Sequence, residues 1–478
     1  MSTTAGPSRS ERRGAPTDAV EELRTARFGR FHVLLVAAVM LATLFDGYDT
    51  LNPSYVIHFV AGPWGLNHSN TGFLVSSGLI GFLVGALAHG PIADRVGRRP
   101  VLLTALVGSG IFSMLTAALA DGFASFVTLR FLTGLFLGVI MPLGTAYINE
   151  FTPARSANRV VIIAISGYCL GGVAASLVGI YATPHHGWHV LYWIGGGSVL
   201  LAALIAPVLP ESVQFQVLHG DHAGIARTLA RIRPERAAAY DGAVFARPRE
   251  RAATGEMLRT LVSANYLRTT IGLWVCAFMV LFCIYGLSGW LPEAMEERGN
   301  GFAASFAFLT ILQTAGIVGG IVIGVLCDRT RLGLPAGIAI LLGIATVAVA
   351  LVGIGTGADG DLVMVGFAGF GIIGGQAVLD TLAAQSYPAH LRSTGTGSMF
   401  GVGRVGGILG PYLIGWILDW TDGRTWLVFV AIGVATALGA ATMAALALRR
   451  TPVRAPDIPL PGPATAPDAI APDGVTAH

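Results

Sequence analysis

The sequence predicts an all-α membrane protein in which twelve transmembrane helices form two six-helix bundles. Hydrophobic residues make up 53% of the 478 residues and charged residues only 12%, whereas soluble proteins carry about 25% charged residues. Twelve apolar stretches are each long enough to cross ~30 Å of hydrocarbon as a helix. A third observation is that motifs of the first half recur in the second half at a nearly constant distance.

The apolar stretches fall into two groups of six on either side of a long polar segment. We therefore predict an N-terminal bundle over residues 31–210, a central loop over 211–267 and a C-terminal bundle over 268–448. The stretches lie at residues 31–57, 71–93, 101–120, 123–148, 160–182, 188–209, 268–291, 303–326, 332–354, 361–385, 394–418 and 425–448. Residues 1–30 form a polar tail, and 449–478, rich in proline, alanine and aspartate, are expected to be disordered.

The distribution of arginine predicts the orientation in the membrane. Every basic residue other than histidine is arginine; six precede the first span and eight lie in the central loop, whereas the opposite loops carry only Arg298 and Arg424. Because positively charged loops stay on the cytoplasmic side, both termini and the central loop are predicted to be cytoplasmic. We expect a multi-pass protein of a bacterial-type plasma membrane, with short amphipathic helices of the central loop lying on its surface.

Three pairs of motifs indicate that the two halves are repeats of one six-helix unit. Asp94 in GPIADRVGRRP and Asp328 in GVLCDRTRLG are 234 positions apart. Pro153 and Pro388, which follow the fourth and tenth spans, are 235 apart, as are SGYCLGG and GVGRVGG. Parallel repeats of this kind are found in transporters.

These motifs also carry a resemblance to a known family. GPIADRVGRR resembles the signature loop of the major facilitator superfamily, LRFLTGLFLG its fourth-span motif and LPES its sixth-span ending. Within that superfamily FDGYD, YGLSGWLP and GVGRVGGILGP are most similar to the aromatic acid:proton symporters. The resemblance implies a major facilitator fold and import of a small aromatic carboxylate, of the benzoate or hydroxybenzoate type, together with protons by alternating access. Asp380 departs from the family pattern, where a neutral residue is expected, and Tyr48 stands where phenylalanine is usual.

Two acids inside the first span raise the question of what they do there, because a charge at the centre of a membrane helix costs roughly 2.5–3.5 kcal/mol. Asp46 and Asp49 share one helix face, ~22 and ~27 Å from the cytoplasmic end, and Arg130 lies at a similar level, ~26 Å from the same side. We expect one aspartate to pair with Arg130 and the other to carry the coupling proton, with Asp49 as the first choice. The alternative is a static ion pair that only holds spans one and four together.

Arg404 is the candidate site for the substrate's carboxylate. It lies ~17 Å into span eleven, and its planar guanidinium matches a carboxylate. The alternative is an internal ion pair with Asp380, which substrate binding would have to break. Tyr285 and Trp290, supported by the family match, are expected to contact the aromatic ring, and Gln376 and Gln385 are expected to bind a ring hydroxyl.

A set of charged residues at the cytoplasmic ends of the spans is expected to act as a gate. Arg98 is placed to reach Glu150, and such contacts would lock the outward-facing state; the alternative is that these arginines only fix the topology. The gating candidates are Asp94, Arg95, Arg98 and Glu150, with Asp328 and Arg392 as weaker counterparts in the second half.

Other activities fit the sequence less well. We expect no enzyme activity, no metal site, no nucleic-acid partner and no cofactor; without a Walker loop, a proton gradient rather than ATP drives transport. The expected partners are a small aromatic acid, protons and the lipid bilayer, with the protein acting as a monomer. The rivals are a major facilitator transporter of a non-aromatic organic acid or sugar, a drug:proton antiporter and a non-transporting membrane receptor.

Overall fold

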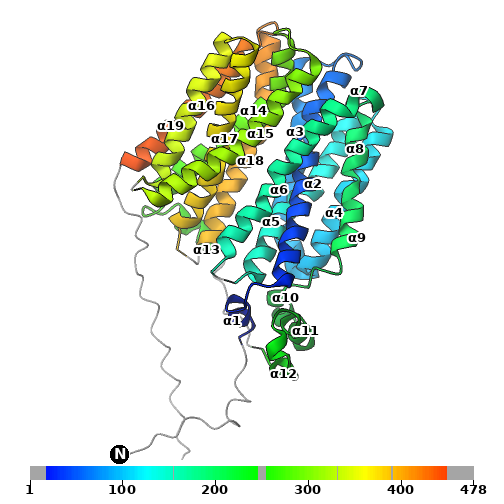
Figure 1. Cartoon of the computed structure of the whole chain (residues 1–478), viewed down its shortest axis with the longest axis vertical. Coiled ribbons are helices and arrows are strands. Elements are labelled where there is room, and N and C mark those ends of the chain that lie inside the picture. The colour runs from blue at the N-terminus through cyan, green and yellow to red at the C-terminus, as the bar shows by residue number, and fades with distance from the viewer. Residues whose placement is uncertain (1–17, 154, 246–253, 331, 389–390, 449–478) are drawn as a thin grey trace, which may run out of the picture.

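The computed structural model describes residues 18–153, 155–245, 254–330, 332–388 and 391–448. Within these residues the regular secondary structure is helical, as the apolar stretches predict (Figure 1). The tail 449–478 and the first 17 residues lie outside the described residues, so the predicted disorder of the C-terminal tail stays a prediction.

The two six-helix bundles lie side by side (Figure 1). The N-terminal bundle contains α2 (Arg30–Val60), α3 (His68–Val96), α4 (Arg98–Leu119), α5 (Phe123–Phe151), α6 (Ala157–Tyr181) and the pair α8 (His189–Gly195) and α9 (Gly197–Ile205). The C-terminal bundle contains α14 (Leu267–Glu296), α15 (Phe302–Arg329), α16 (Leu334–Ile354), α17 (Ala358–Ser386), α18 (Arg392–Trp420) and α19 (Trp426–Leu448). Among the described residues, eleven helices are long and apolar enough to cross a membrane, and the α8–α9 pair completes the twelve.

The sixth span is interrupted, which the sequence analysis did not predict. It follows the short α7 (Thr183–His186) and divides at Gly196, inside a run of three glycines. Glycine weakens a helix by about 1 kcal/mol relative to alanine. A Cβ at Gly195 would lie 2.4 Å from the hydroxyl oxygen of Ser113 and 3.5 Å from the carboxyl carbon of Asp49. The lack of a side chain at Gly195 therefore lets this span approach Ser113 and Asp49 closely.

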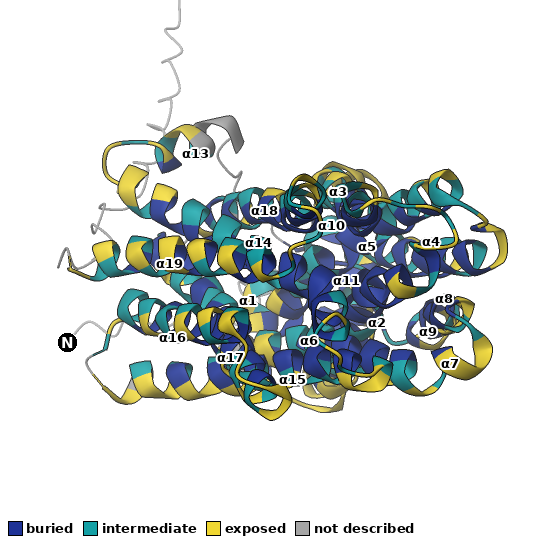
Figure 2. Cartoon of the chain, turned by 90° about the horizontal axis from the view of Figure 1, so that it is seen from above, coloured by how far each residue is buried: buried dark blue, intermediate teal, exposed yellow. Residues whose placement is uncertain are grey.

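Figure 2 shows exposed residues along the flanks of the helices, and many large hydrophobic side chains are among the exposed residues of both bundles. Leu200 and Ile354, for example, are 76% and 80% exposed. An apolar surface of this extent is unstable in water but is the expected surface of a bundle surrounded by lipid. The fold is therefore that of a multi-pass membrane protein.

Short helices cover one end of the N-terminal bundle, which we call the basic end because it carries Arg30, Arg98 and Arg99. They are α1 (Ala19–Arg24), α10 (Val213–Leu218), α11 (His222–Ile232), η2 (Pro234–Arg236) and α12 (Ala237–Tyr240); α13 (Thr254–Leu261) lies at the same end of the other bundle (Figure 1). The central loop forms short helices, and their predicted place on the membrane surface stays a prediction. Within the segment expected as a polar tail, residues 19–24 form α1, which docks on this layer through Glu22; that side chain accepts hydrogen bonds of 2.6 Å from Arg233 and from Arg236.

The hydrogen bonds and ion pairs that we find between described residues of the two bundles run from mid-bundle to the opposite end. Asp419 of α18 accepts hydrogen bonds from the backbone N–H groups of His68 and Ser69 at 2.9 and 2.8 Å, and from the Ser69 hydroxyl. His58 lies 2.7 Å from Glu296, and Ser76 donates to the main chain of Ile408 at 2.6 Å. Among the described residues, the polar contacts between the bundles therefore hold them together at the opposite end, and none is found at the basic end.

Candidate functional site: buried charges between the bundles

Asp49 of α2 and Arg130 of α5 form an ion pair inside the N-terminal bundle. Arg130 Nη1 lies 3.0 Å from Asp49 Oδ1, and Nη2 donates to the Asp49 main-chain carbonyl at 2.8 Å. The hydroxyl of Ser113 and the amide of Asn52 each lie 3.4 Å from the same Oδ1. Both charged side chains are almost completely buried. The predicted partner for Arg130 is found, and it is Asp49.

Asp46, one turn earlier on α2, has no ion-pair partner among the described residues. Its Oδ1 accepts one long hydrogen bond, of 3.3 Å, from Thr50, and its Oδ2 is buried without a hydrogen-bond partner. The side chain is 0% exposed. The two acids are therefore not equivalent: Asp49 is neutralised by Arg130, and Asp46 is the acid with unused hydrogen-bonding capacity.

Gly47, between the two acids, permits a close approach of α6. A Cβ at this position would lie 2.0 Å from the main-chain oxygen of Tyr168, a distance that no side chain can occupy. The expectation that a neighbouring helix approaches α2 here is confirmed. The contact places Tyr168 beside Asp46, and the hydroxyl of Tyr168 lies 2.7 Å from that of Tyr285 on α14, which joins the two bundles at mid-depth.

Arg404 of α18 lies on the other side of this tyrosine pair. Its Nη1 donates to the Tyr285 hydroxyl at 2.5 Å, and its guanidinium carbon lies 3.9 Å from the ring centroid of Phe82 on α3. No ion pair with a carboxylate is found for it among the described residues, although the charges of Asp46 and Asp380 are close enough to interact with its own. It is 8% exposed. Arg404 therefore belongs to the C-terminal bundle but faces aromatic and acidic groups of the N-terminal one.

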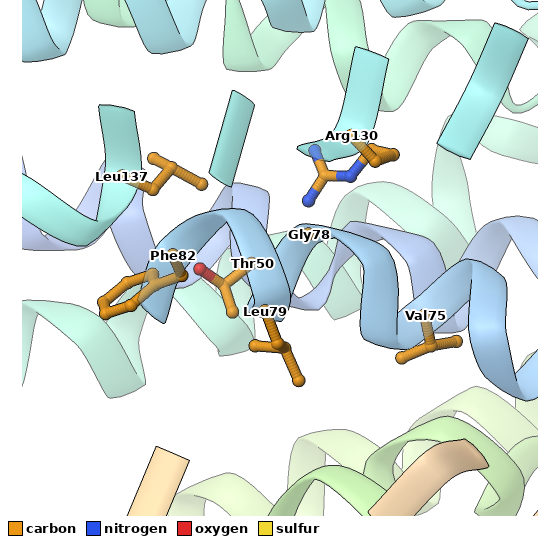
Figure 3. Close-up of a pocket in the computed structure, with 7 residues that line it drawn as sticks. All are labelled: Thr50, Val75, Gly78, Leu79, Phe82, Arg130 and Leu137. Atoms are coloured by element: carbon orange, nitrogen blue, oxygen red, sulfur yellow. The ribbon is translucent and has the colours of Figure 1, made fainter. Parts of the chain in front are cut away.

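A narrow space too small for a water molecule lies beside these charges (Figure 3). Thr50, Phe82 and Arg130 line it, together with Val75, Gly78, Leu79 and Leu137. Thr50 is the residue that donates to Asp46, Phe82 is the ring against Arg404, and Arg130 is the partner of Asp49. The space is too thin to hold a bound acid, so the site is closed around its charged groups in this conformation.

The alternative pairing of Arg404 with Asp380 is not found in this structure. Asp380 Oδ1 instead accepts a hydrogen bond of 2.7 Å from Gln376 Nε2, one turn earlier on α17. The oxygen of the Gln376 amide is buried without a partner. The structure thus brings Gln376 and Asp380 together and leaves Arg404 free for a ligand.

Two of the predicted substrate contacts lie elsewhere. Trp290 is fully buried ~9 Å from the opposite end of α14, where its indole N–H donates to the Pro411 main chain at 2.9 Å and its ring packs near His68. Gln385 is exposed next to the last residue of α17, at the basic end. Trp290, which the family match suggested, therefore lies toward the end opposite the basic end. Neither Trp290 nor Gln385 belongs to the site around Arg404.

Of the predicted gate, one pair is formed, but not as a contact between the bundles. Arg98 pairs with Glu150 of α5, and Glu150 also accepts hydrogen bonds of 2.9 Å from Ser212. Glu211 accepts from the backbone N–H of Arg98 at 2.8 Å, against Gly97, whose φ of 105° suits glycine. The pair lies within the N-terminal bundle, where it joins α4 to α5, and its role in gating stays a prediction.

The remaining gate residues are not engaged. Asp94 and Arg95 are exposed at the end of α3, and among the described residues neither forms an ion pair. Arg392 is exposed at the first turn of α18, and the side chain of Asp328 lies outside the described part of the chain. The gating role of these residues stays a prediction.

Comparison with known proteins decides the family. A profile of the Major Facilitator Superfamily matches residues 35–411. The chain belongs to the major facilitator superfamily. The gallate transporter of Pseudomonas putida is 32% identical over 446 residues, which are 92% of this chain and 97% of that protein. The 4-hydroxybenzoate transporter PcaK of the same species is 34% identical over 403 residues, 84% of this chain and 89% of the relative.

A solved structure with the same fold is that of the xylose transporter XylE from E. coli in a partially occluded inward open conformation. It aligns with a TM-score of 0.69 at 16% identity and covers 87% of this chain and 99% of its own. The resemblance to the superfamily stated from the sequence is confirmed, and the protein is a transporter and not an enzyme. Within the described residues of this transporter, no group of three or more histidine, cysteine, aspartate or glutamate side chains is placed to hold a metal.

Sequence reasoning missed several residues of the site. Phe82 and Thr50 carry no charge and belong to no motif, so only the packing of α2, α3 and α18 identifies them. Asp419 and His68 were overlooked because they lie near span ends, where charged residues are ordinary. A signal was available for them: the opposite end is poor in arginine, so its acids have few other partners.

Proposed function

We propose that this transporter imports a small aromatic carboxylate together with protons across the plasma membrane by alternating access. The gallate and 4-hydroxybenzoate transporters, to which it is similar over most of their lengths, support this substrate class. The arginine distribution supports a cytoplasmic basic end. The conformation described above then faces the cytoplasm, with its extracytoplasmic end held shut by Asp419.

One observation carries the proposal: Arg404 and Asp46, on different bundles, are close enough for their charges to interact, and neither has an ion-pair partner among the residues that the structure describes. A buried arginine without a counter-ion is unfavourable, and here aromatic rings and one tyrosine hydroxyl are its nearest contacts. An anionic ligand that reached Arg404 would supply the missing charge through a bidentate contact. Phe82 and Tyr285 supply aromatic faces beside that contact, on which a ring can pack.

The same arrangement couples a proton to the substrate. Arg404 is one positive charge facing two candidate negative charges, the carboxylate of Asp46 and that of the substrate. If Asp46 is ionised, it partly neutralises the charge of Arg404 and repels the incoming anion. If Asp46 is protonated, the substrate's carboxylate no longer competes with it for Arg404. A pair of charges ~4 Å apart interacts by about 4 kcal/mol at an effective dielectric constant of 20, so the coupling can reach the 1–3 kcal/mol typical of linked sites.

Asp46 is therefore the acid to which we assign the proton, in place of Asp49. The pairing of Asp49 with Arg130 keeps that carboxylate neutralised by a fixed charge, which favours its ionised form in every step of the cycle. In this assignment the Asp49–Arg130 pair is a structural element that holds α2 and α5 in register. Tyr168 and Tyr285 join the proton-binding and substrate-binding halves of the site by their hydroxyl contact.

Closure of the basic end requires groups that are now free. We assign this role to Asp94 and Arg95, which lie near the end of α3 and are exposed. The Arg98–Glu150–Glu211 cluster holds α4 and α5 to the segment between α9 and α10, so that the N-terminal bundle can rock as a unit. The exposed Arg392 is the counterpart on α18.

Uptake into proteoliposomes tests the proposal. Labelled benzoate, 4-hydroxybenzoate and gallate are compared with xylose, with and without an imposed inside-alkaline pH gradient. We expect accumulation of at least one aromatic acid only with the gradient, and Arg404→Leu is expected to abolish it. Arg424→Leu, which removes an exposed arginine from the same bundle at a position with no assigned role, is the comparison for a general effect of lost charge on substrate binding. Uptake that is independent of the gradient, or aromatic acid binding unchanged in Arg404→Leu, would overturn the proposal.

A further inference from the structure

The pair Gln376–Asp380 is the part of the site whose chemistry the proposed mechanism does not use. The two residues lie one turn apart on α17, and the charge of Asp380 is close enough to that of Arg404 to interact with it. Asp380 is partly buried in a membrane helix, where an ionisable group is costly and is usually retained for a function. Its only hydrogen bond among the described residues comes from Gln376.

That hydrogen bond fixes which groups remain available. Gln376 Nε2 donates to Asp380 Oδ1 at 2.7 Å, so the amide must present its nitrogen to the carboxylate and its oxygen away from it. The Gln376 oxygen is buried and unpartnered, and Asp380 Oδ2 accepts no hydrogen bond from the described residues. The pair therefore offers two acceptors. An acceptor buried without a donor costs about 1–3 kcal/mol.

The position of the pair relative to Arg404 suggests the group that would supply the donor. Asp380 lies six residues from the end of α17 at Ser386, and Arg404 lies twelve residues from the start of α18 at Arg392. At 1.5 Å per residue these positions differ by ~9 Å in depth, with Asp380 nearer the basic end. A benzene ring with a substituent at each end, hydrogen-bonded at both ends, fits a separation of this order.

We propose that Gln376 and Asp380 form a specificity subsite that selects aromatic acids carrying a hydrogen-bond donor, a hydroxyl or an amino group, on the side of the ring away from the carboxylate. This inference rests on the proposed function, because it assumes that Arg404 holds the carboxylate. In this subsite, the ring hydroxyl donates a hydrogen bond to Asp380 Oδ2 or to the Gln376 oxygen. An unsubstituted ring would leave that acceptor without a donor. An aromatic ether of similar shape has no donor and gains nothing at this position.

Competition for uptake in proteoliposomes tests the subsite. The probes are 4-hydroxybenzoate, 4-aminobenzoate, benzoate and 4-methoxybenzoate, and the readout is the ratio of inhibition constants between donor and non-donor acids. A hydrogen bond to a charged group is worth about 1.5–3 kcal/mol, so the parent is expected to prefer the donor acids by about 10-fold or more. Asp380→Leu is expected to reduce this ratio to about 3-fold or less, and Asp380→Asn to an intermediate value because the neutral amide still accepts. Thr381→Val is the matched control: its hydroxyl donates to its own helix at Ala377, so the ratio is expected to stay unchanged.

The outcomes separate this inference from the function on which it rests. If the parent takes up no aromatic acid, both are wrong. If it takes up aromatic acids but does not distinguish donors, or if Asp380→Asn and Asp380→Leu keep the parental ratio, only the subsite is wrong. Asp380→Asn could also abolish gradient-driven uptake of every acid and leave their relative binding unchanged. In that case Asp380 carries a proton, and its assignment to a specificity subsite is wrong.

Discussion

Replacing Asp49 by asparagine tests the different assignments of the two acids of α2. In the parent, Arg130 makes contacts of 3.0 Å to the Asp49 carboxylate and 2.8 Å to its main chain. The Asp49→Asn change leaves a buried guanidinium without its counter-charge, which costs about 3–5 kcal/mol when a buried pair is broken. Asp46→Asn removes no ion pair and alters one hydrogen bond of 3.3 Å, a change of about 0.5–1.5 kcal/mol. The free energies of unfolding of the two variants are therefore expected to differ by several kcal/mol, although both replace an aspartate by an asparagine.

Thermal unfolding of the purified protein in one detergent measures this difference. We expect the unfolding midpoint to fall strongly in Asp49→Asn and little in Asp46→Asn. The double variant Asp49→Asn/Arg130→Gln should recover part of the loss, because it contains no unpaired charge. The reasoning would be refuted by an Asp46→Asn variant at least as unstable as Asp49→Asn, or by a double variant whose loss is the sum of the two single losses.

Three further predictions concern packing contacts. Asp419→Ala removes an acceptor that holds the two bundles together at the end opposite the basic end, so a cysteine probe in that end should react faster with a membrane-impermeant thiol reagent. Asp359→Ala, at the same end but exposed, should not change the rate, and equal rates in both variants would contradict the closure. Gly47→Ala places a Cβ 2.0 Å from a carbonyl of α6 and should abolish the folded protein in fluorescence-detected gel filtration; Gly401→Ala, with open space around its Cβ, is the control that should fold. Glu22→Ala should increase amide hydrogen exchange in α1 at least tenfold, and unchanged exchange would mean that its arginine contacts do not dock that helix.

Much of the fold could be predicted because the membrane imposes simple constraints on the sequence. Span lengths, the polar segment between the halves and the repeat of Asp94 and Pro153 gave the two-bundle architecture without coordinates. The interrupted sixth span was not predicted, because its apolar run is continuous and only the run of glycines at residues 195–197 marks the break. The docked helix α1 was not predicted either, since six residues in a charged segment show too little periodicity.

The candidate site was predicted in composition but not in connectivity. Asp46, Asp49, Arg130 and Arg404 stand out because charges are rare in apolar spans. Which acid meets Arg130 depends on how α2 and α5 are rotated about their axes, and an i, i+3 spacing leaves both acids on the facing side. Trp290 shows the reverse error: a residue within a recognised motif was assigned to the ligand, whereas its indole nitrogen serves the packing of α14 against α18.

Counterflow and accumulation, measured side by side in Asp46→Asn proteoliposomes, test the central claim that Asp46 carries the coupling proton opposite Arg404. Counterflow exchanges labelled for unlabelled acid and needs no net proton movement, whereas accumulation against a concentration gradient requires it. We predict that Asp46→Asn retains counterflow and loses accumulation driven by an inside-alkaline pH gradient. A variant that still accumulates the acid like the parent would show that the proton binds elsewhere.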